Sequence, residues 1–245
     1  ERFVFGSEVK AIHASGLVKP QLDKRGLLQY MTFQNFINAD TLYQDVKLLP
    51  PGCYGIVNSD KKTFDIHRFW DFKFSEDRNL KYEECVEELR YLIKQAVSRQ
   101  LVSDVEIGSY LSGGMDSGSI AALAGAQLPY MKTFTVGFDM SSASGMELSF
   151  DERSKAEYMS YLFKTEHYEM VLKSGDMERC FHNLSKHLEE PRVGQSYPNY
   201  YAAKLASKFT KVVLSGAGGD EIFAGYPWRY YRAIGRKGFE DYIDE

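Results

Sequence analysis

The chain has 245 residues, of which 44% are hydrophobic and 26% are charged, with a formal net charge of -4. This composition is typical of a soluble globular protein, and the chain has no Lys/Arg run that would mark a nucleic-acid surface. No apolar stretch reaches the roughly 20 residues of a membrane span, and residues 1–6 lack the layout of a signal peptide. We therefore expect neither a nucleic-acid nor a membrane partner.

The three cysteines, Cys53, Cys85 and Cys180, are odd in number and far apart. They form no CxxC pair, so neither a disulfide framework nor a zinc site is indicated. Thiols of this kind are typical of a reducing compartment, and we expect a cytoplasmic protein.

The first 75 residues predict a small mixed segment without obvious chemistry. Its expected elements are a strand at 3–5, a helix over 7–12 capped by Ser7, a helix opened by Asp23, and a β-hairpin of residues 52–57 and 63–66. The segment is small for an independent domain.

A polar stretch, residues 73–81, separates this segment from an alternating pattern. The pattern starts with an amphipathic helix over 82–101 and continues with apolar, β-prone runs that alternate with helical ones. The expected strands are 105–111, 133–138, 166–172 and 211–214; the expected helices are 119–127, 151–164, 174–190 and 196–209; residues 139–150 are expected to be a surface loop. The pattern predicts an α/β fold with a parallel sheet and helices on both faces. We expect two domains, residues 1–75 and 76–245.

Two glycine-rich segments each follow a predicted strand and precede a predicted helix. Residues 112–117 read Ser-Gly-Gly-Met-Asp-Ser, and residues 214–221 read Leu-Ser-Gly-Ala-Gly-Gly-Asp-Glu. Ligands of open α/β sheets bind beyond the carboxyl ends of the strands, so we expect both loops at one edge of the sheet.

The first loop has the properties of a phosphate cradle. Gly113 and Gly114 let main-chain N–H groups approach an anion, Ser112 and Ser117 add hydroxyl donors, and the following helix adds a positive partial charge. About four or five such bonds, at about 1.5–3 kcal/mol each, would hold a polyphosphate without a lysine. The simpler alternative is a tight turn in which Asp116 only caps the helix.

Each loop also carries an aspartate, Asp116 or Asp220. A carboxylate would repel phosphate unless a divalent cation lay between them, which points to Mg²⁺. The loops match none of the motifs GxxxxGK[ST], GxGxxG and GxSxG. The sequence therefore favours a nucleotide site with a metal.

Residues 112–117 resemble the SGGxDS loop of the ATP-pyrophosphatase family, which binds the pyrophosphate part of ATP while adenylating a carboxylate or a similar oxygen. Residues 213–226 resemble the LSGxGxDExFxGY block of asparagine synthetases, and residues 189–198 and 227–232 also look like that family. With order and spacing intact, these blocks cover most of residues 105–235.

The resemblance implies that the β-carboxylate of aspartate attacks the α-phosphorus of ATP, and that ammonia, from glutamine, then displaces AMP from β-aspartyl-AMP. It implies ATP binding by Leu111, Ser112, Gly113, Gly114, Asp116, Ser117, Val136, Gly137, Ser215 and Gly216, catalytic roles for Asp116, Asp220 and Glu221, and Mg²⁺ ligation by Asp116 and Asp220. The sequence is also compatible with a homodimer.

One position departs from the family pattern. Asparagine synthetases often carry a glutamate or aspartate where this chain has Ala217. Either a neighbour such as Glu221 or Glu190 takes over that role, or the protein adenylates another carboxylate as a related amidotransferase or cyclase. A catalytically dead ATP-binding protein is a third alternative, and the intact Asp116 and Asp220 argue against it.

The front of the chain resembles the end of the same family's glutaminase domain. Residues 5–11 are similar to its FxSExKAL string, and residues 49–52 and 68–71 to its closing hairpin. That domain is an α/β sandwich of the N-terminal-nucleophile hydrolase type, whose catalytic cysteine is the first residue of the mature protein. Neither this cysteine nor the family's later catalytic lysine is present, so we expect an internal fragment that is inactive by itself.

Overall fold

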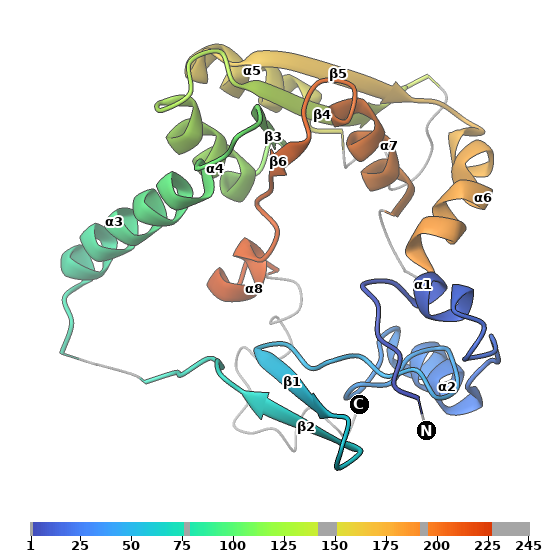
Figure 1. The fold of residues 1–245 in the computed structure, drawn as a ribbon. Helices are drawn as coiled ribbons and strands as arrows, with labels where there is room; N and C mark the ends of the chain where they lie inside the picture. Colours follow the sequence, from blue (N-terminus) through green and yellow to red (C-terminus); the bar gives the residue numbers. More distant parts are fainter. Residues whose placement is uncertain (1, 76–78, 142–150, 192–195, 227–245) are drawn as a thin grey trace, which may run out of the picture. The chain divides into compact units, whose positions relative to one another are not determined.

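The computed structural model describes residues 2–75, 79–141, 151–191 and 196–226. The chain splits into two compact units, whose elements are labelled in Figure 1. Unit 1 comprises Glu1–Leu80 and Glu178–Ser196, and unit 2 comprises Lys81–Met177 and Tyr197–Glu245. A segment that lies between two parts of unit 2 in the sequence therefore belongs to unit 1.

Unit 2 is built on a four-stranded parallel sheet in the order β5-β4-β3-β6, which confirms the predicted parallel sheet. Its strands are β3 (Ile107–Tyr110), β4 (Lys132–Phe138), β5 (Glu166–Leu172) and β6 (Val212–Leu214). The chain runs outward from β3 through β4 to β5 and then returns to the opposite side of β3 as β6. The strand order thus reverses between β3 and β6, the kind of position where open α/β sheets bind ligands.

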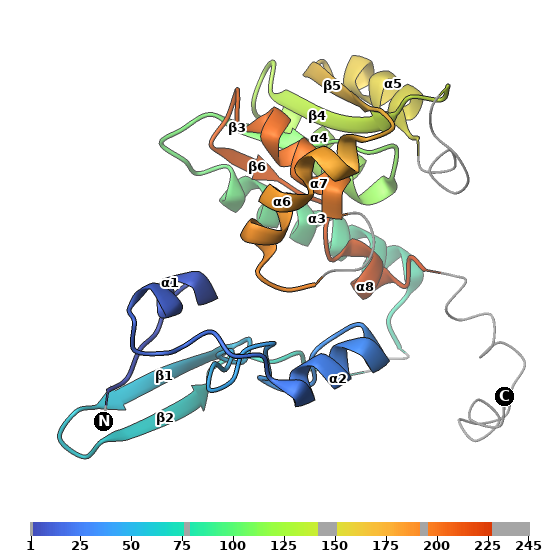
Figure 2. The same cartoon turned by 90° about the vertical axis from the view of Figure 1, so that its right-hand side faces the viewer.

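Helices cover both faces of this sheet, as predicted. On one face α4 and α5 pack against the strands and α3 packs against α4, while α7 covers the other face (Figure 2). The helices after unit 1's first part are α3 (Tyr82–Gln100), α4 (Met115–Gly125), α5 (Arg153–Phe163), α6 (Asp176–Leu188), α7 (Ser196–Ala206) and α8 (Gly219–Phe223). No helix in the described ranges combines the length and the apolar composition of a bilayer span.

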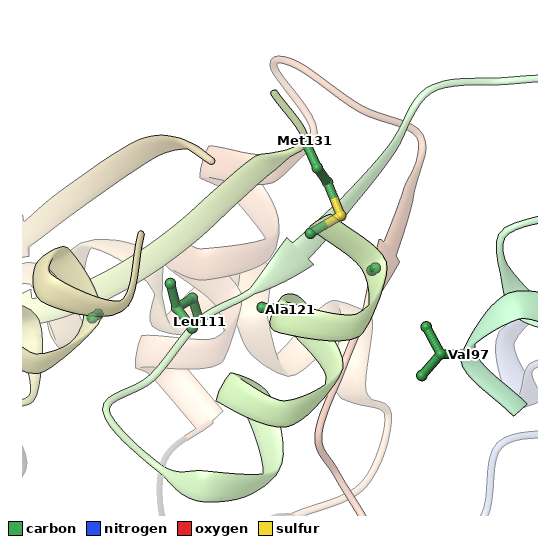
Figure 3. Close-up of a cluster of buried hydrophobic side chains, with 6 residues drawn as sticks. Val97, Leu111, Ala121 and Met131 are labelled. Atoms are coloured by element: carbon green, nitrogen blue, oxygen red, sulfur yellow. The ribbon is translucent and has the colours of Figure 1, made fainter. Parts of the chain in front are cut away.

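A separate hydrophobic core lies on each face of the sheet. The first is formed by Val97, Leu111, Ala121, Ala124, Met131 and Ala156, four of which are labelled in Figure 3. The alanines among them have no exposed surface, and their small size lets α4 and α5 lie close to the sheet and to each other. The second core joins Phe134, Leu205 and Ala206.

Unit 1 contains α1 (Val9–Ala14), α2 (Lys24–Phe33) and the predicted hairpin, formed by β1 (Cys53–Asn58) and β2 (Thr63–Arg68). Asp23 caps α2 as expected, because its Oδ1 accepts from the N–H groups of Arg25 (2.8 Å) and Gly26 (3.1 Å). The expected strand at residues 3–5 is wrong, since these residues lie in no strand. Tyr54, Ile56, Phe64 and Ile66 of the hairpin are 45–49% exposed in this structure.

The amino end of α1 is capped by a residue far away in the sequence. Oε2 of Glu189 accepts from Val9 N–H (2.8 Å) and Oε1 from Lys10 N–H (2.7 Å), across 180 and 179 residues. Tyr43 also donates its hydroxyl to the carbonyl oxygen of Glu189 (3.1 Å). The expected cap by Ser7 is wrong, because Glu189 supplies the acceptors that the first turn needs.

The backbone conformation of Glu189 also supports its role as the cap of α1. Glu189 follows the last residue of α6 and has φ 59, a left-handed conformation in which glycine is the usual residue. Its side chain is only 12% exposed. A glutamate held in this conformation is explained by the two main-chain bonds that its carboxylate accepts.

We expect Glu189→Ala to lower the free energy of unfolding of unit 1 by about 2 kcal/mol, because the first turn of α1 loses both charge-assisted acceptors. Urea denaturation of the whole chain measures the loss. Glu8→Ala is the matched control: Glu8 precedes α1 but makes no side-chain cap, so we expect a change within about 0.5 kcal/mol. Equal stability of the two variants would contradict the capping role.

Candidate active site

The two glycine-rich loops leave the same edge of the sheet from adjacent strands. Residues 112–114 connect β3 to α4, and residues 215–218 connect β6 to α8. β3 and β6 are paired in parallel, so their carboxyl ends lie side by side. Helix α4 starts at Met115, earlier than the predicted residue 119, and the first loop therefore leads directly into its first turn.

The loops are in direct contact. A Cβ added to Gly216 would lie 2.7 Å from the Ser117 nitrogen and 3.0 Å from two atoms of Asp116. A Cβ added to Gly219 would overlap the carboxylate of Asp116. At Gly216 the obstacle is the main chain of α4, so glycine is needed there for the loops to approach this closely, whereas a side chain at residue 219 would have to displace the Asp116 carboxylate.

Two serines hold the first loop in shape. Their hydroxyls lie 2.8 Å apart, Ser117 Oγ accepts from the N–H of Ser112 (3.0 Å), and Ser112 Oγ accepts from the N–H of Gly114 (3.1 Å). We expected Ser112 and Ser117 to offer their hydroxyls to an anion; in this structure the hydroxyls bond each other and the loop. Their roles as ATP-binding residues stay a prediction.

Main-chain groups are the donors that the loop leaves accessible. Met115, Asp116 and Ser117 occupy the first turn of α4, whose N–H groups have no acceptor within the helix. Among the described residues, the N–H groups of Gly113, Met115 and Asp116 make no hydrogen bond to another loop or side chain. The loop can therefore donate several main-chain hydrogen bonds to one bound anion.

The end of β4 offers a second set of main-chain groups. Leu111 donates its N–H to the Phe134 carbonyl (3.0 Å), and beyond Phe134 no residue of β3 pairs with β4. Residues two apart in a strand direct their main-chain groups to the same side, so Val136 faces the space beyond the end of β3. Within the described ranges, no hydrogen bond on that side uses its N–H or C=O.

Gly137, the next residue, is covered from the start of α5. A Cβ there would overlap both Arg153 and Asp151. Arg153 donates to both carboxylate oxygens of Asp151 (2.8 Å each) and to the Phe138 carbonyl (2.9 Å). These bonds from Arg153 hold the pKa of the Asp151 carboxyl below its usual value.

The sequence does not predict the ion pair between Arg153 and Asp151. Residues 151–153, Asp-Glu-Arg, predict a helix start with acidic residues near its amino end. The resemblance to asparagine synthetases implies in addition that this neighbourhood lies close to the active site. The contacts of Arg153 and Asp151 with Gly137 and Phe138 show that the start of α5 lies over the carboxyl end of β4.

Leu111 lies in the core. Its side chain is 1% exposed and belongs to the same hydrophobic core as Ala121; both residues are labelled in Figure 3. Its carbonyl oxygen accepts from the hydroxyl of Thr135. The predicted contact between this residue and ATP stays a prediction.

The carboxylates of the two loops have different neighbours. That of Asp116 covers Gly219, and that of Asp220 lies against Gly225 beyond the end of α8. Glu221 accepts a hydrogen bond from the hydroxyl of Tyr226 (3.0 Å). Ser215 accepts from the N–H of the exposed Ala217 (3.2 Å).

The donor chemistry is suitable for Mg²⁺. This ion binds through one or two carboxylates and takes its remaining ligands from substrate phosphates and water. Asp116 and Asp220 come from loops in contact, and Asp116 covers the residue next to Asp220. In the described part of the chain, no group of three or more His, Cys, Asp or Glu side chains is placed to hold a metal ion. Ligation by this pair stays a prediction.

Comparison with known proteins defines the class. Residues 88–244 match the Asparagine synthase family, and residues 1–70 match the Glutamine amidotransferase domain family. The first match covers nearly all of unit 2, including its parallel sheet and both glycine-rich loops. The chain belongs to the asparagine synthase family.

Particular relatives carry the corresponding names. Asparagine synthetase [glutamine-hydrolyzing] 1 of Bacillus subtilis is 32% identical over 84% of this chain and 31% of its own length. Asparagine synthetase [glutamine-hydrolyzing] 3 of the same organism is 29% identical over 97% of this chain and 40% of its own length. The chain thus spans well under half of either relative. Among solved structures, the glutamine-dependent NAD⁺ synthetase from Acinetobacter baumannii aligns with 70% of this chain and 31% of its own, at 17% identity and a TM-score of 0.36.

Proposed function

We propose that the protein is an ATP-dependent asparagine synthetase that takes its ammonia from glutamine. The contact between the two glycine-rich loops, at the point where the strand order reverses, is the observation that carries the proposal. Membership of the asparagine synthase family supports it. In this proposal residues 76–245 bind ATP, and residues 1–75 are the carboxyl-terminal part of the domain that hydrolyses glutamine.

The loops would bind ATP through main-chain groups. The N–H groups at the start of α4 would donate to the β- and γ-phosphates, with the second loop, Ser215 and Gly216, on the other side. Val136 and Gly137 would direct main-chain groups at the adenine. Asp116 and Asp220 would hold Mg²⁺, which neutralises charge on the phosphates when it is bound.

Catalysis would then rest on positioning and on fixed donors. The β-carboxylate of aspartate attacks the α-phosphorus of ATP, the bond to the β-phosphate oxygen breaks, and pyrophosphate leaves with the charge that the loop donors stabilise. Ammonia next attacks the acyl carbon of β-aspartyl-AMP, loses a proton, and expels AMP to give asparagine.

Ala217 favours a second candidate, in which the same site adenylates another carboxylate. Its methyl group supplies neither a base nor a metal ligand, and Glu221, the nearest substitute in sequence, accepts from Tyr226. We further propose a cytoplasmic location, which the odd number and wide separation of Cys53, Cys85 and Cys180 in the sequence support. A homodimer stays a prediction.

Pyrophosphate release by the full-length protein tests the proposal. We expect AMP and pyrophosphate in equal amounts when ATP, Mg²⁺, aspartate and ammonium are supplied together, and little without aspartate. Turnover that requires a different carboxylate would replace aspartate as the acceptor. Formation of ADP and phosphate, or no ATP cleavage with any acceptor, would contradict adenylation at this site.

A further inference from the structure

A lysine side chain lies on the first glycine-rich loop. A Cβ added to Gly113 would lie 2.6 Å from Cβ and 2.8 Å from Cδ of Lys155, and 3.1 Å from Cβ of Glu152. Lys155 belongs to the first turn of α5, the segment whose Arg153 covers Gly137. The start of α5 therefore covers both the end of β4 and the loop that follows β3.

This contact limits the positions that the ammonium group of Lys155 can reach. The ammonium group is two bonds beyond Cδ, and Cδ lies on Gly113, so the charge stays beside the loop. A lysine commonly packs its carbon chain on a surface while its ammonium remains in water, and Lys155 is an exposed residue. The missing side chain of Gly113 is thus what allows the lysine to lie there.

The ammonium of Lys155 has no counter-ion in the described ranges. Among the described residues its side chain makes no ion pair or hydrogen bond, and the only bond to Glu152 runs from the main-chain N–H of Lys155 to the Glu152 carbonyl (3.1 Å). Arg153, by contrast, is already bonded to Asp151 and to the Phe138 carbonyl. Lys155 is therefore an available cation beside the loop, whereas Arg153 is engaged.

The charges around the first loop indicate what the ammonium group of Lys155 could bind. The loop donors are uncharged N–H groups, and the nearby side chains Asp116 and Glu152 are acidic. A polyphosphate carries several negative charges, which an ammonium group binds well as a compact point charge. We propose that Lys155 is a phosphate-binding residue, whose ammonium contacts the β- or γ-phosphate of ATP and the pyrophosphate that is released. The proposal rests on the proposed function and revises our expectation of a cradle without a lysine.

Binding of inorganic pyrophosphate to the full-length protein tests this role. We expect Lys155→Ala and Lys155→Gln to weaken pyrophosphate binding about tenfold, the effect of one charge-assisted bond in a partly exposed site. Lys155→Arg should keep most of the affinity. Binding of AMP, which lacks the β- and γ-phosphates, should be unchanged in every variant. Isothermal titration calorimetry measures both ligands, and the KM for ATP should rise more than kcat falls.

The control is Lys211→Ala, an exposed lysine directly before β6 and hence at the opposite edge of the sheet. It should bind pyrophosphate as the wild type does. Unchanged pyrophosphate binding in Lys155→Ala would overturn the assignment, and so would an equal loss of AMP affinity, which would indicate a purely structural role. If the wild type binds ATP and Lys155→Ala binds ATP and pyrophosphate with the same affinity, only this inference is overturned. Failure of the wild type to bind ATP at all would overturn the proposed function with it.

Discussion

Replacing Asp116 by asparagine is expected to reduce ATP-dependent pyrophosphate release at least about 100-fold, provided that the site works with a divalent cation. Asparagine has the shape of aspartate and keeps the contact with Gly219, so the two loops can stay together. The negative charge that would hold Mg²⁺ next to the phosphates is lost. The assay is pyrophosphate release by the full-length protein over a Mg²⁺ titration, because higher Mg²⁺ should restore part of the activity.

Asp104→Asn is the matched control for this substitution. Asp104 is exposed and precedes β3, which places it at the edge of the sheet opposite to the loops. The same change of charge there should leave activity and its Mg²⁺ dependence as they are. Full activity of Asp116→Asn at low Mg²⁺ would show that Asp116 does not hold the ion and is only an acidic residue in the first turn of α4.

The second large effect is expected from Gly216→Ala. The new methyl group would lie 2.7 Å from the main-chain nitrogen of Ser117, which cannot move aside as a flexible side chain can. The two loops must separate, and the donors at the start of α4 shift with them. We expect a loss of about 100-fold in pyrophosphate release, since displacements of this size in a positioned site have such effects. We also expect about 1–3 kcal/mol lower stability from the overpacked contact.

Gly125→Ala makes the same substitution in unit 2 at a position with room. A Cβ on this last residue of α4 would be 3.5 Å from its nearest neighbour, an ordinary contact. Activity should be retained and stability equal or slightly higher, because alanine favours the helix. If Gly216→Ala behaves like Gly125→Ala in both measurements, contact between the loops is not required for function.

The alternation of strand and helix patterns predicted much of the fold. Hydrophobic runs and their spacing indicated the parallel sheet and helices on both of its faces, which the structure confirms. The cap of α1 could not be predicted in this way. Ser7 is a local candidate, whereas Glu189 reaches Val9 only after the chain has folded across 180 residues. Local rules select among neighbours in the sequence and cannot anticipate a partner that tertiary structure brings in.

The site shows the same division between local and distant information. The two glycine-rich loops are adjacent because β3 and β6 are neighbours in the sheet. The absence of side chains at Gly216 and Gly219 is consistent with the close approach of the second loop to the start of α4. The positions of Arg153 and Lys155 depend on how α5 packs over the end of β4. Their letters carry no signal of this packing, because arginine and lysine near a helix start are common on any exposed surface.

The membership of Glu178–Ser196 in unit 1 bears on how the protein can be divided in the laboratory. A truncated product that began at Lys81 would keep Glu189 but would lose Val9, Lys10 and Tyr43, which all bond to it. Its carboxylate would then have to find water or stay without donors, at a cost in stability. Proteolytic cleavage next to Leu80 would, for the same reason, leave two pieces joined by these bonds. Any dissection of the chain should therefore keep its amino-terminal residues together with the segment that follows α6.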